Sequence, residues 1–210
     1  MLFSEDKSMK FIIISSEMGF DREARAFNKL FDAGASLLHL RKPQVTKPEL
    51  ADLLQQISTD YYDRIVLHDH FELAYSFGLK GIHLNRRNPN RPEFEVSSVS
   101  CSCHSLKQVS DCAGNYNYVF LSPIFDSISK SGYNHAFTEP ELRDAQEKNI
   151  INENVIALGG INETTIPLAK KYGFGGMAVL GALWEDYSCD KDEDKLLQRF
   201  KNLHSIINQK

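Results

Sequence analysis

The stretch from Val155 to Ile161, Val-Ile-Ala-Leu-Gly-Gly-Ile, constrains the fold of this chain more than any other. Its consecutive apolar residues predict a strand that is buried on both faces, and such strands belong to parallel sheets. A polar turn and a helical run, Ile166 to Tyr172, follow, and then a second buried strand, Gly176–Leu180, ends at Gly181. The stretch therefore opens a strand-helix-strand unit with glycine at the carboxyl end of both strands.

The glycines Gly159, Gly160 and Gly181 leave backbone N–H groups exposed at two neighbouring strand ends. Such groups form a cup for an anion, most often a phosphate. In a (β/α)8 barrel the loops after the seventh and eighth strands commonly form this cup. The alternative is that these glycines only permit tight turns.

Strands alternate with helices along the whole chain. Short apolar runs predict strands at Phe11–Ser15, Leu37–Leu40, Ile65–Leu67, Gly81–Leu84, Val96–Cys103, Val119–Leu121, Val155–Leu158 and Gly176–Leu180. Apolar residues three and four apart predict helices at Arg22–Ala33, Pro48–Ile57, Leu73–Phe77, Ser105–Cys112, Glu139–Lys148, Ile166–Tyr172 and Lys191–Ile207. Asp21 is the expected N-cap of the first helix, and Asn85–Pro89 is expected to be a polar loop.

This alternation predicts an α/β protein with a single (β/α)8 TIM barrel over residues 1–210, in which residues 1–10 form a loose segment. An open doubly wound sheet is the alternative, because glycine-rich strand ends suit it as well. No G-x-G-x-x-G motif follows the first strand, which favours the closed barrel.

Composition excludes several classes of function. A net charge of -4 and scattered basic residues give no field for a nucleic acid. The longest apolar runs are too short to span a membrane, and Met1–Lys10 lacks a signal-peptide core, so we expect a cytoplasmic protein. The cysteines are expected to be free thiols, since Cys101, Cys103 and His104 find no second pair of zinc ligands at a useful spacing.

Polar residues follow the predicted strands and converge on one mouth in a barrel. They are His39, Arg41, His68, Asp69, Asn85, Asn88, Ser102, His104, Ser127, Ser129 and Lys130. Arg41 and Lys130 bring positive charge, and Asp69 is a hard oxygen ligand that suits Mg²⁺. The alternatives are that Arg41 and Lys42 form a solvated pair, that Asp69 caps the next helix, and that His39 and His83 are hydrogen-bonded core residues. Because no nucleophile stands beside a base, Mg²⁺-assisted departure of a diphosphate fits better than acyl transfer.

From Phe11 to Trp184 the chain resembles the thiamine phosphate synthase and thiazole tautomerase family of (β/α)8 enzymes. The residues that carry the resemblance are Leu38–Lys42 for Gln-Leu-Arg-x-Lys, Leu67–Asp69 for Asn-Asp, Gly81–Leu84, Ser102–Ser105 for Ser-Thr-His-Ser, Ser122–Lys130 for Gly-Pro-x-Phe-x-Thr-x-Thr-Lys, and Ala157–Ile161.

The resemblance implies condensation of hydroxymethylpyrimidine diphosphate with thiazole phosphate, giving thiamine phosphate and diphosphate. It also implies Mg²⁺, bound at Asp69 and Asn88, as the cofactor. Small phosphorylated pyrimidine and thiazole compounds are then the partners, a homodimer is left open, and neither nucleic acid nor membrane is expected. Carried over, the catalytic residues are Arg41, Lys130, His68 and Ser102, of which Arg41, Lys130 and Ser102 hold the pyrimidine diphosphate. His39 and Lys42 bind substrate, and the residues at the thiazole phosphate are Ser127, Ser129, Gly160, Leu180 and Gly181.

The chain departs from the synthase pattern at several of these positions. The glutamine is His39, the asparagine is His68, and the lysine of Arg-x-Lys is replaced by Pro43 with Lys42 beside it. Asn88 replaces the second metal carboxylate, which removes a full charge and weakens the Mg²⁺ site. A metal-independent thiazole phosphate tautomerase and a non-catalytic phosphate-binding paralogue are therefore the alternatives, although Pro123 stands where the tautomerase histidine is expected.

Overall fold

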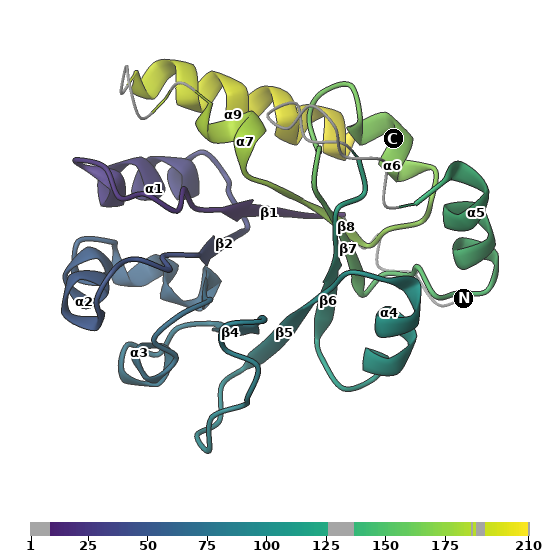
Figure 1. Cartoon of the computed structure of the whole chain (residues 1–210). Helices are drawn as coiled ribbons and strands as arrows, with labels where there is room; N and C mark the ends of the chain where they lie inside the picture. The colour runs from purple at the N-terminus through teal and green to yellow at the C-terminus, as the bar shows by residue number, and fades with distance from the viewer. Residues whose placement is uncertain (1–8, 126–136, 186, 188–191, 210) are drawn as a thin grey trace, which may run out of the picture.

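The computed structural model describes residues 9–125, 137–185, 187 and 192–209. Its eight strands are all parallel and close into a barrel in chain order (Figure 1). They are β1 Lys10–Ile14, β2 Leu37–Leu40, β3 Ile65–Leu67, β4 Gly81–Leu84, β5 Ser98–Cys103, β6 Tyr118–Leu121, β7 Val155–Leu158 and β8 Gly176–Val179. The predicted (β/α)8 barrel is confirmed, and the open doubly wound sheet is excluded because β1 pairs with β8.

Helices surround the strands (Figure 1). They are α1 Glu23–Asp32, α2 Lys47–Gln55, the 3-10 helix η1 Thr59–Arg64, α3 Glu72–Ser76, α4 Leu106–Cys112, α5 Glu139–Glu147, α6 Ile166–Lys170, α7 Gly181–Trp184 and α9 Glu193–Asn208. No helix joins β4 to β5, in agreement with the polar turn residues of this segment. The sequence did not predict the short elements η1 and α7.

Capping residues explain where helices begin. Thr138 begins α5 with a capping box, since its side chain accepts from the Glu141 N–H and the Glu141 carboxylate accepts from the Thr138 N–H. The prediction that Asp21 caps α1 is wrong: the N-cap is Arg22, in a left-handed conformation without a side-chain cap. The Asp69 carboxylate does not cap α3 either, whose N-cap is Phe71.

Both faces of every strand are buried, which explains the apolar strands of the sequence. On β1, for example, Phe11 and Ile13 face the helices and Phe11 stacks on Phe200 of α9 at 5.5 Å. Ile12 and Ile14 face the barrel interior with residues of β6, β7 and β8. The interior changes character around the barrel, because the buried polar side chains His39, His68, His83, Ser98 and Ser100 all come from β2 to β5 or the residue after β3.

Helix α9 packs on the outside of the barrel against α1, α6 and α7. The side chain of Trp184 on α7 donates to the Ile14 carbonyl at 2.7 Å and packs edge-on against Phe27. This ties the end of β1 to the segment after β8. In the part of the chain that the structure describes, no helix combines the length and apolar character needed to cross a membrane.

The three described cysteines are free thiols, as predicted. Cys101 and Cys103 of β5 point away from the barrel interior, and the Cys101 Sγ lies 3.8 Å from Cys112 Sγ on α4. Cys189 lies outside the described residues. Of the expected loose segment at residues 1–10, only Met9 and Lys10 are described, and Lys10 already belongs to β1.

Candidate active site

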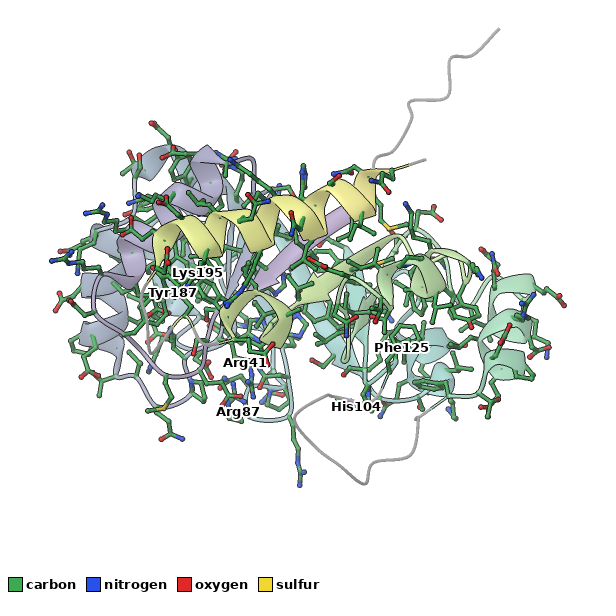
Figure 2. All side chains as sticks on the ribbon, turned by 90° about the horizontal axis from the view of Figure 1, so that it is seen from above. Arg41, Arg87, His104, Phe125, Tyr187 and Lys195 are labelled. Atoms are coloured by element: carbon green, nitrogen blue, oxygen red, sulfur yellow. The ribbon has the colours of Figure 1, made fainter. Side chains whose placement is uncertain are left out.

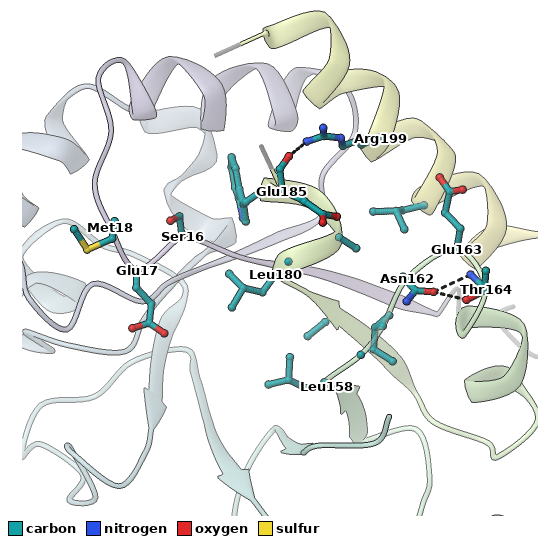
Figure 3. A pocket seen from close by; sticks show the side chains of 18 residues that line it. Ser16, Glu17, Met18, Leu158, Asn162, Glu163, Thr164, Leu180, Glu185 and Arg199 are labelled. Atoms are coloured by element: carbon teal, nitrogen blue, oxygen red, sulfur yellow. Dashed lines mark hydrogen bonds between the residues drawn. The ribbon is translucent and has the colours of Figure 1, made fainter. Parts of the chain in front are cut away.

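A cavity of about 930 Å³ opens at the carboxyl ends of the strands, beside β7, β8 and β1 (Figure 3). Ser16 and Glu17 after β1 line one side, and Gly160 after β7 lines the other. Leu180 and Gly181 after β8 complete the wall. The predicted glycine loops thus border a space large enough for a small phosphorylated molecule.

The backbone of these loops offers hydrogen-bond donors to the cavity. Within the described residues, the N–H groups of Gly160, Gly181 and Ala182 make no hydrogen bond. Gly160 adopts a φ of 64°, which an L side chain rarely accepts. The Asn162 side chain holds the turn, because its Oδ1 accepts from the Thr164 N–H at 2.9 Å. A preformed set of free donors of this kind suits an anion.

Arg41 stands at the edge of this cavity. It follows β2, and its guanidinium pairs with Glu17, a cavity residue, while 29% of its side chain stays exposed. The Ser15 hydroxyl accepts from the Arg41 N–H at 2.9 Å, which fixes the backbone. The charges of Arg41 and Arg87 both lower the pKa of His68, after burial and the neighbouring imidazoles, and Figure 2 shows the two arginines on the same side of the molecule as His104. Arg41 thus brings a positive charge, paired with Glu17, to the part of the mouth after β1 and β2.

Lys42, predicted to bind substrate, is directed elsewhere. Its side chain is fully buried, and its Nζ lies 2.5 Å from the Glu23 carboxylate on α1. It also donates to the Ser16 carbonyl at 2.8 Å. Burial raises the pKa of Glu23 to about 7 against the pull of the Lys42 charge, and burial lowers the pKa of Lys42. Lys42 thus holds the loop after β1. Because its ammonium donates to Glu23 and to the Ser16 carbonyl, it is not directed at a substrate in the mouth.

Three imidazoles form a hydrogen-bonded network below the mouth. His39 Nδ1 lies 2.8 Å from His68 Nε2, and His39 Nε2 lies 2.7 Å from the Tyr118 hydroxyl. His83 bridges Ser100 and Ser102 of β5, with 2.8 Å to each hydroxyl. The rings of His68 and His83 stack at 4.3 Å. His39 and His83 are thus hydrogen-bonded core residues, which agrees with the alternative weighed from the sequence.

The outer end of this network faces the mouth. Among the described residues, every fully buried side-chain nitrogen or oxygen has a hydrogen-bond partner. His68 Nδ1 has no such partner among these residues, whereas His68 Nε2 bonds to His39. This nitrogen is therefore open to solvent, although only 4% of the residue is exposed. A ligand at the mouth can reach it.

Burial keeps all three imidazoles neutral. It lowers the pKa of His39 and His68 well below 6.5, with the neighbouring His83 as the next cause. Burial and the Arg41 charge lower the pKa of His83 to about 3. A neutral imidazole offers one donor and one acceptor, and the network decides which nitrogen has which role.

The predicted metal residues Asp69 and Asn88 lie together. Asp69 Oδ1 accepts from Arg87 Nη2 and from Asn88 Nδ2, both at 3.0 Å, and Oδ2 accepts from the Lys42 N–H at 3.2 Å. Asn88 Nδ2 also donates to the His68 carbonyl at 2.9 Å, so the amide presents its nitrogen, not its oxygen, to Asp69. One carboxylate whose two oxygens are both filled does not fit a Mg²⁺ held by protein ligands.

The remaining predicted residues divide into two sets. Ser102 is half-buried in the imidazole network, and His104 is exposed with its Nδ1 3.0 Å from the Ser122 carbonyl. Ser127, Ser129 and Lys130 lie outside the described residues.

Sequence reasoning missed Glu17, Arg87 and Tyr118 in this site. Arg87 lies in the predicted polar loop. Its position directly before Asn88, which replaces a metal-binding carboxylate, could have indicated a positive charge in place of the metal. Tyr118 was placed before the sixth strand, although Tyr118 and Phe120 alternate as inward positions of β6. No signal marked Glu17.

The described residues place N–H groups without partners after β7 and β8, an arginine after each of β2 and β4, and imidazoles in β2, in β4 and directly after β3. This arrangement at one barrel mouth suits an enzyme that binds anionic substrates. The model of the thiamine monophosphate synthase family matches residues 11–183. The chain belongs to this family.

Individual relatives agree with this membership. A thiamine-phosphate synthase of Lysinibacillus sphaericus is 24% identical, with 96% of this chain and 98% of the relative covered. That of Staphylococcus haemolyticus is 27% identical, with 96% and 100% covered. The crystal structure of thiamine phosphate pyrophosphorylase from Bacteroides thetaiotaomicron superposes with a TM-score of 0.85 at 42% identity, covering 94% of this chain and 97% of that one.

Proposed function

We propose that the protein is a thiamine-phosphate synthase, which condenses hydroxymethylpyrimidine diphosphate with thiazole phosphate to thiamine phosphate and diphosphate. The observation that carries the proposal is that one barrel mouth has two separate regions suited to anions. Free N–H groups gather at Gly160 and Gly181, and arginines gather at Arg41 and Arg87. A reaction between two phosphorylated molecules needs two such regions. The names of the relatives support the same activity.

The thiazole phosphate is assigned to the glycine loops. The N–H groups of Gly160, Gly181 and Ala182 donate to its phosphate, and Leu180 offers an apolar wall. The predicted contribution of Ser127 and Ser129 to this half stays a prediction.

The pyrimidine diphosphate is assigned to the side of Arg41, with Ser102 and His68 beneath the ring. Where synthases carry glutamine and asparagine, this chain has His39 and His68. A primary amide carries N–H donors and an acceptor oxygen, and a neutral imidazole carries one N–H donor and one acceptor nitrogen. Because burial keeps these imidazoles neutral, each retains both a donor and an acceptor, as the amides do. The predicted role of Lys130 at the diphosphate stays a prediction.

Synthases of this family use Mg²⁺. When bound, the metal supplies charge that stabilises the leaving diphosphate. In this chain the Asp69 carboxylate already accepts from Arg87 and Asn88, which does not fit a metal held by these residues. A cytoplasmic location and a homodimer stay predictions.

The synthase is favoured over the two alternatives. A tautomerase needs no binding region for diphosphate, and a paralogue that only binds phosphate needs no cations opposite the glycine loops. The comparisons also bring out relatives named thiamine-phosphate synthase.

Steady-state kinetics with both substrates test the proposal, with diphosphate release and thiamine phosphate formation as the two readouts. A Cβ on Gly181 meets no heavy atom within 4 Å, so the position accepts a side chain, and Gly181→Val adds bulk at a residue that lines the cavity. We expect the KM for thiazole phosphate to rise about 10-fold, equivalent to about 1.4 kcal/mol, with an unchanged KM for the pyrimidine diphosphate. Arg41→Gln should raise the KM for the pyrimidine diphosphate and leave the KM for thiazole phosphate unchanged.

Gly19→Val is the matched control, because a Cβ there also meets no heavy atom within 4 Å and Gly19 does not line the cavity. It should leave both KM values unchanged. Turnover of a thiazole carboxylate phosphate without any diphosphate release would replace the proposed activity with that of the tautomerase. Binding of thiazole phosphate without turnover of either kind would leave only the non-catalytic paralogue.

A further inference from the structure

The Arg87 guanidinium occupies the place where the synthase resemblance put a metal ion. It lies between Asp69 and solvent, with Nη2 at 3.0 Å from Oδ1 and Nε at 3.3 Å from the same oxygen. Only 10% of the Asp69 side chain is exposed, whereas 41% of the Arg87 side chain is exposed. The carboxylate therefore anchors the arginine from below and leaves its outer face to a ligand.

The loop after β4 holds Arg87 in this position. Asn85 Oδ1 accepts from the Arg87 N–H at 2.9 Å, and the Asn85 side chain donates to the His68 carbonyl at 3.0 Å. The N–H and carbonyl groups of Asn85 and Asn88 bond to each other in both directions at 3.1 Å. The guanidinium is thus pre-positioned by a turn that is itself attached to the end of β3.

The charges at this position balance in the same way as in a metal site. Two carboxylates and one Mg²⁺ sum to zero, and so do one carboxylate and one guanidinium. The replacement of the second carboxylate by Asn88 removes the charge that a single arginine could not neutralise. The absence of a second carboxylate at Asn88 and the presence of Arg87 therefore together keep this position electrically neutral without a metal ion.

We propose that Arg87 is a catalytic residue that binds the departing diphosphate in place of a protein-bound Mg²⁺. The proposal rests on the synthase activity proposed above. Two of the guanidinium nitrogens, Nε and Nη2, contact Asp69, and within the described residues Nη1 makes no hydrogen bond. A guanidinium carries five N–H donors in a fixed fork, so the edge of Arg87 that includes Nη1 can donate to the diphosphate, together with Arg41 at the same mouth.

The bond changes need no further reactant. The bond between the pyrimidine methylene carbon and the diphosphate oxygen breaks, and its electron pair leaves with the diphosphate. The lone pair of the thiazole nitrogen then forms the new carbon–nitrogen bond. The charge that grows on the leaving oxygen is met by the guanidinium, which is already held in place and loses no free energy to reorganisation.

The decisive measurement is diphosphate release by the full chain in EDTA and across a Mg²⁺ titration. We expect the wild-type rate in EDTA to stay within about 3-fold of the rate at saturating Mg²⁺. Arg87→Met keeps the apolar stem but removes the charge, and should lose about 100-fold in EDTA. Arg86→Met, at the adjacent exposed position of the same loop, is the matched control and should behave as the wild type.

A second variant tests the same arrangement in the opposite direction. Arg87→Met combined with Asn88→Asp restores two carboxylates, so it should release diphosphate only when Mg²⁺ is present. Release by the wild type that is abolished in EDTA would overturn the role of Arg87 and leave the synthase activity intact.

Calorimetry with inorganic diphosphate in EDTA provides a readout that does not depend on turnover. Arg87→Met should weaken binding about 10-fold relative to Arg86→Met. If no variant turns over at any Mg²⁺ concentration, the proposed function fails, yet this comparison still decides whether Arg87 binds the anion. Equal affinities of the two variants would refute that role.

Discussion

Single residues at the mouth have chemical properties that depend on the side chains packed around them. The imidazoles of His39 and His68 stand where the resemblance to the synthases predicts a glutamine and an asparagine, and the proposed role of both depends on their staying neutral. Burial, not their chemical identity, ensures this. At this scale the environment of a side chain, more than its type, defines the chemistry.

Gly159 illustrates such a constraint by its backbone. Its φ is 95°, and a Cβ there would lie 2.8 Å from the Pro123 Cα. Gly159→Ala should therefore lower the free energy of unfolding by about 1–3 kcal/mol, measured by urea denaturation. Gly181→Ala, whose Cβ meets no heavy atom within 4 Å, is the control and should change little. Equal effects of the two substitutions would mean that Gly159 is not conformationally required.

Between elements, a buried ion pair connects β2 to α1 and to the loop that lines the cavity. Lys42 follows β2, Glu23 begins α1, and Lys42 also donates to the carbonyls of Ser16 and Met18. A buried pair adds little net stability, but removing one partner leaves an uncompensated charge. The pair therefore orders the loop that carries Glu17.

At pH 8, where Glu23 is ionised, we expect Glu23→Gln to lower the free energy of unfolding by about 3–5 kcal/mol, since it leaves the Lys42 ammonium without its counter-ion. Glu23→Leu combined with Lys42→Met should recover most of this loss, because both charges are removed together. Chemical denaturation measures both variants. Glu139→Gln, which breaks the exposed pair with Arg143, is the control and should have a far smaller effect. A double variant as unstable as the single one would contradict this account.

The whole molecule responds to pH through its buried imidazoles. The unfolded chain protonates these histidines near pH 6.5, whereas the folded chain holds the pKa of His39 and His68 well below 6.5 and that of His83 at about 3. Their stabilising contribution is present above pH 6.5 and is lost as the pH falls toward the folded pKa values. Glu23 acts in the opposite direction: with its pKa raised from 4.5 to about 7, its contribution is present below pH 4.5 and is lost as the pH rises through 7.

Because the imidazoles outnumber this carboxyl, the free energy of unfolding should fall on acidification from pH 6.5 to 4.5. His83→Gln removes one proton from the difference between the two states, so the slope should decrease by at most about 1.4 kcal/mol per pH unit. Urea denaturation across this pH range measures both slopes. A slope that His83→Gln does not change would show that His83 is protonated in the folded chain.

The sequence by itself determined the fold, because its signals are local. Consecutive apolar residues such as Val155–Leu158, glycine at strand ends and capping residues such as Thr138 act within a few positions of one another, and the eight strands that they predict form the observed barrel. The glycine loops after β7 and β8 were readable for the same reason, since a strand end places its backbone at the mouth wherever the rest of the chain goes.

Only the tertiary structure decided what the polar side chains contact. Lys42 and Arg41 are adjacent in sequence, yet Lys42 turns into the core toward Glu23 while Arg41 stays at the mouth beside Glu17. Arg87 and Asp69 form a pair across two strand ends, which no spacing along the chain encodes. A charged side chain lowers its free energy by finding an opposite charge in space, and closure of the barrel determines which charges are within reach.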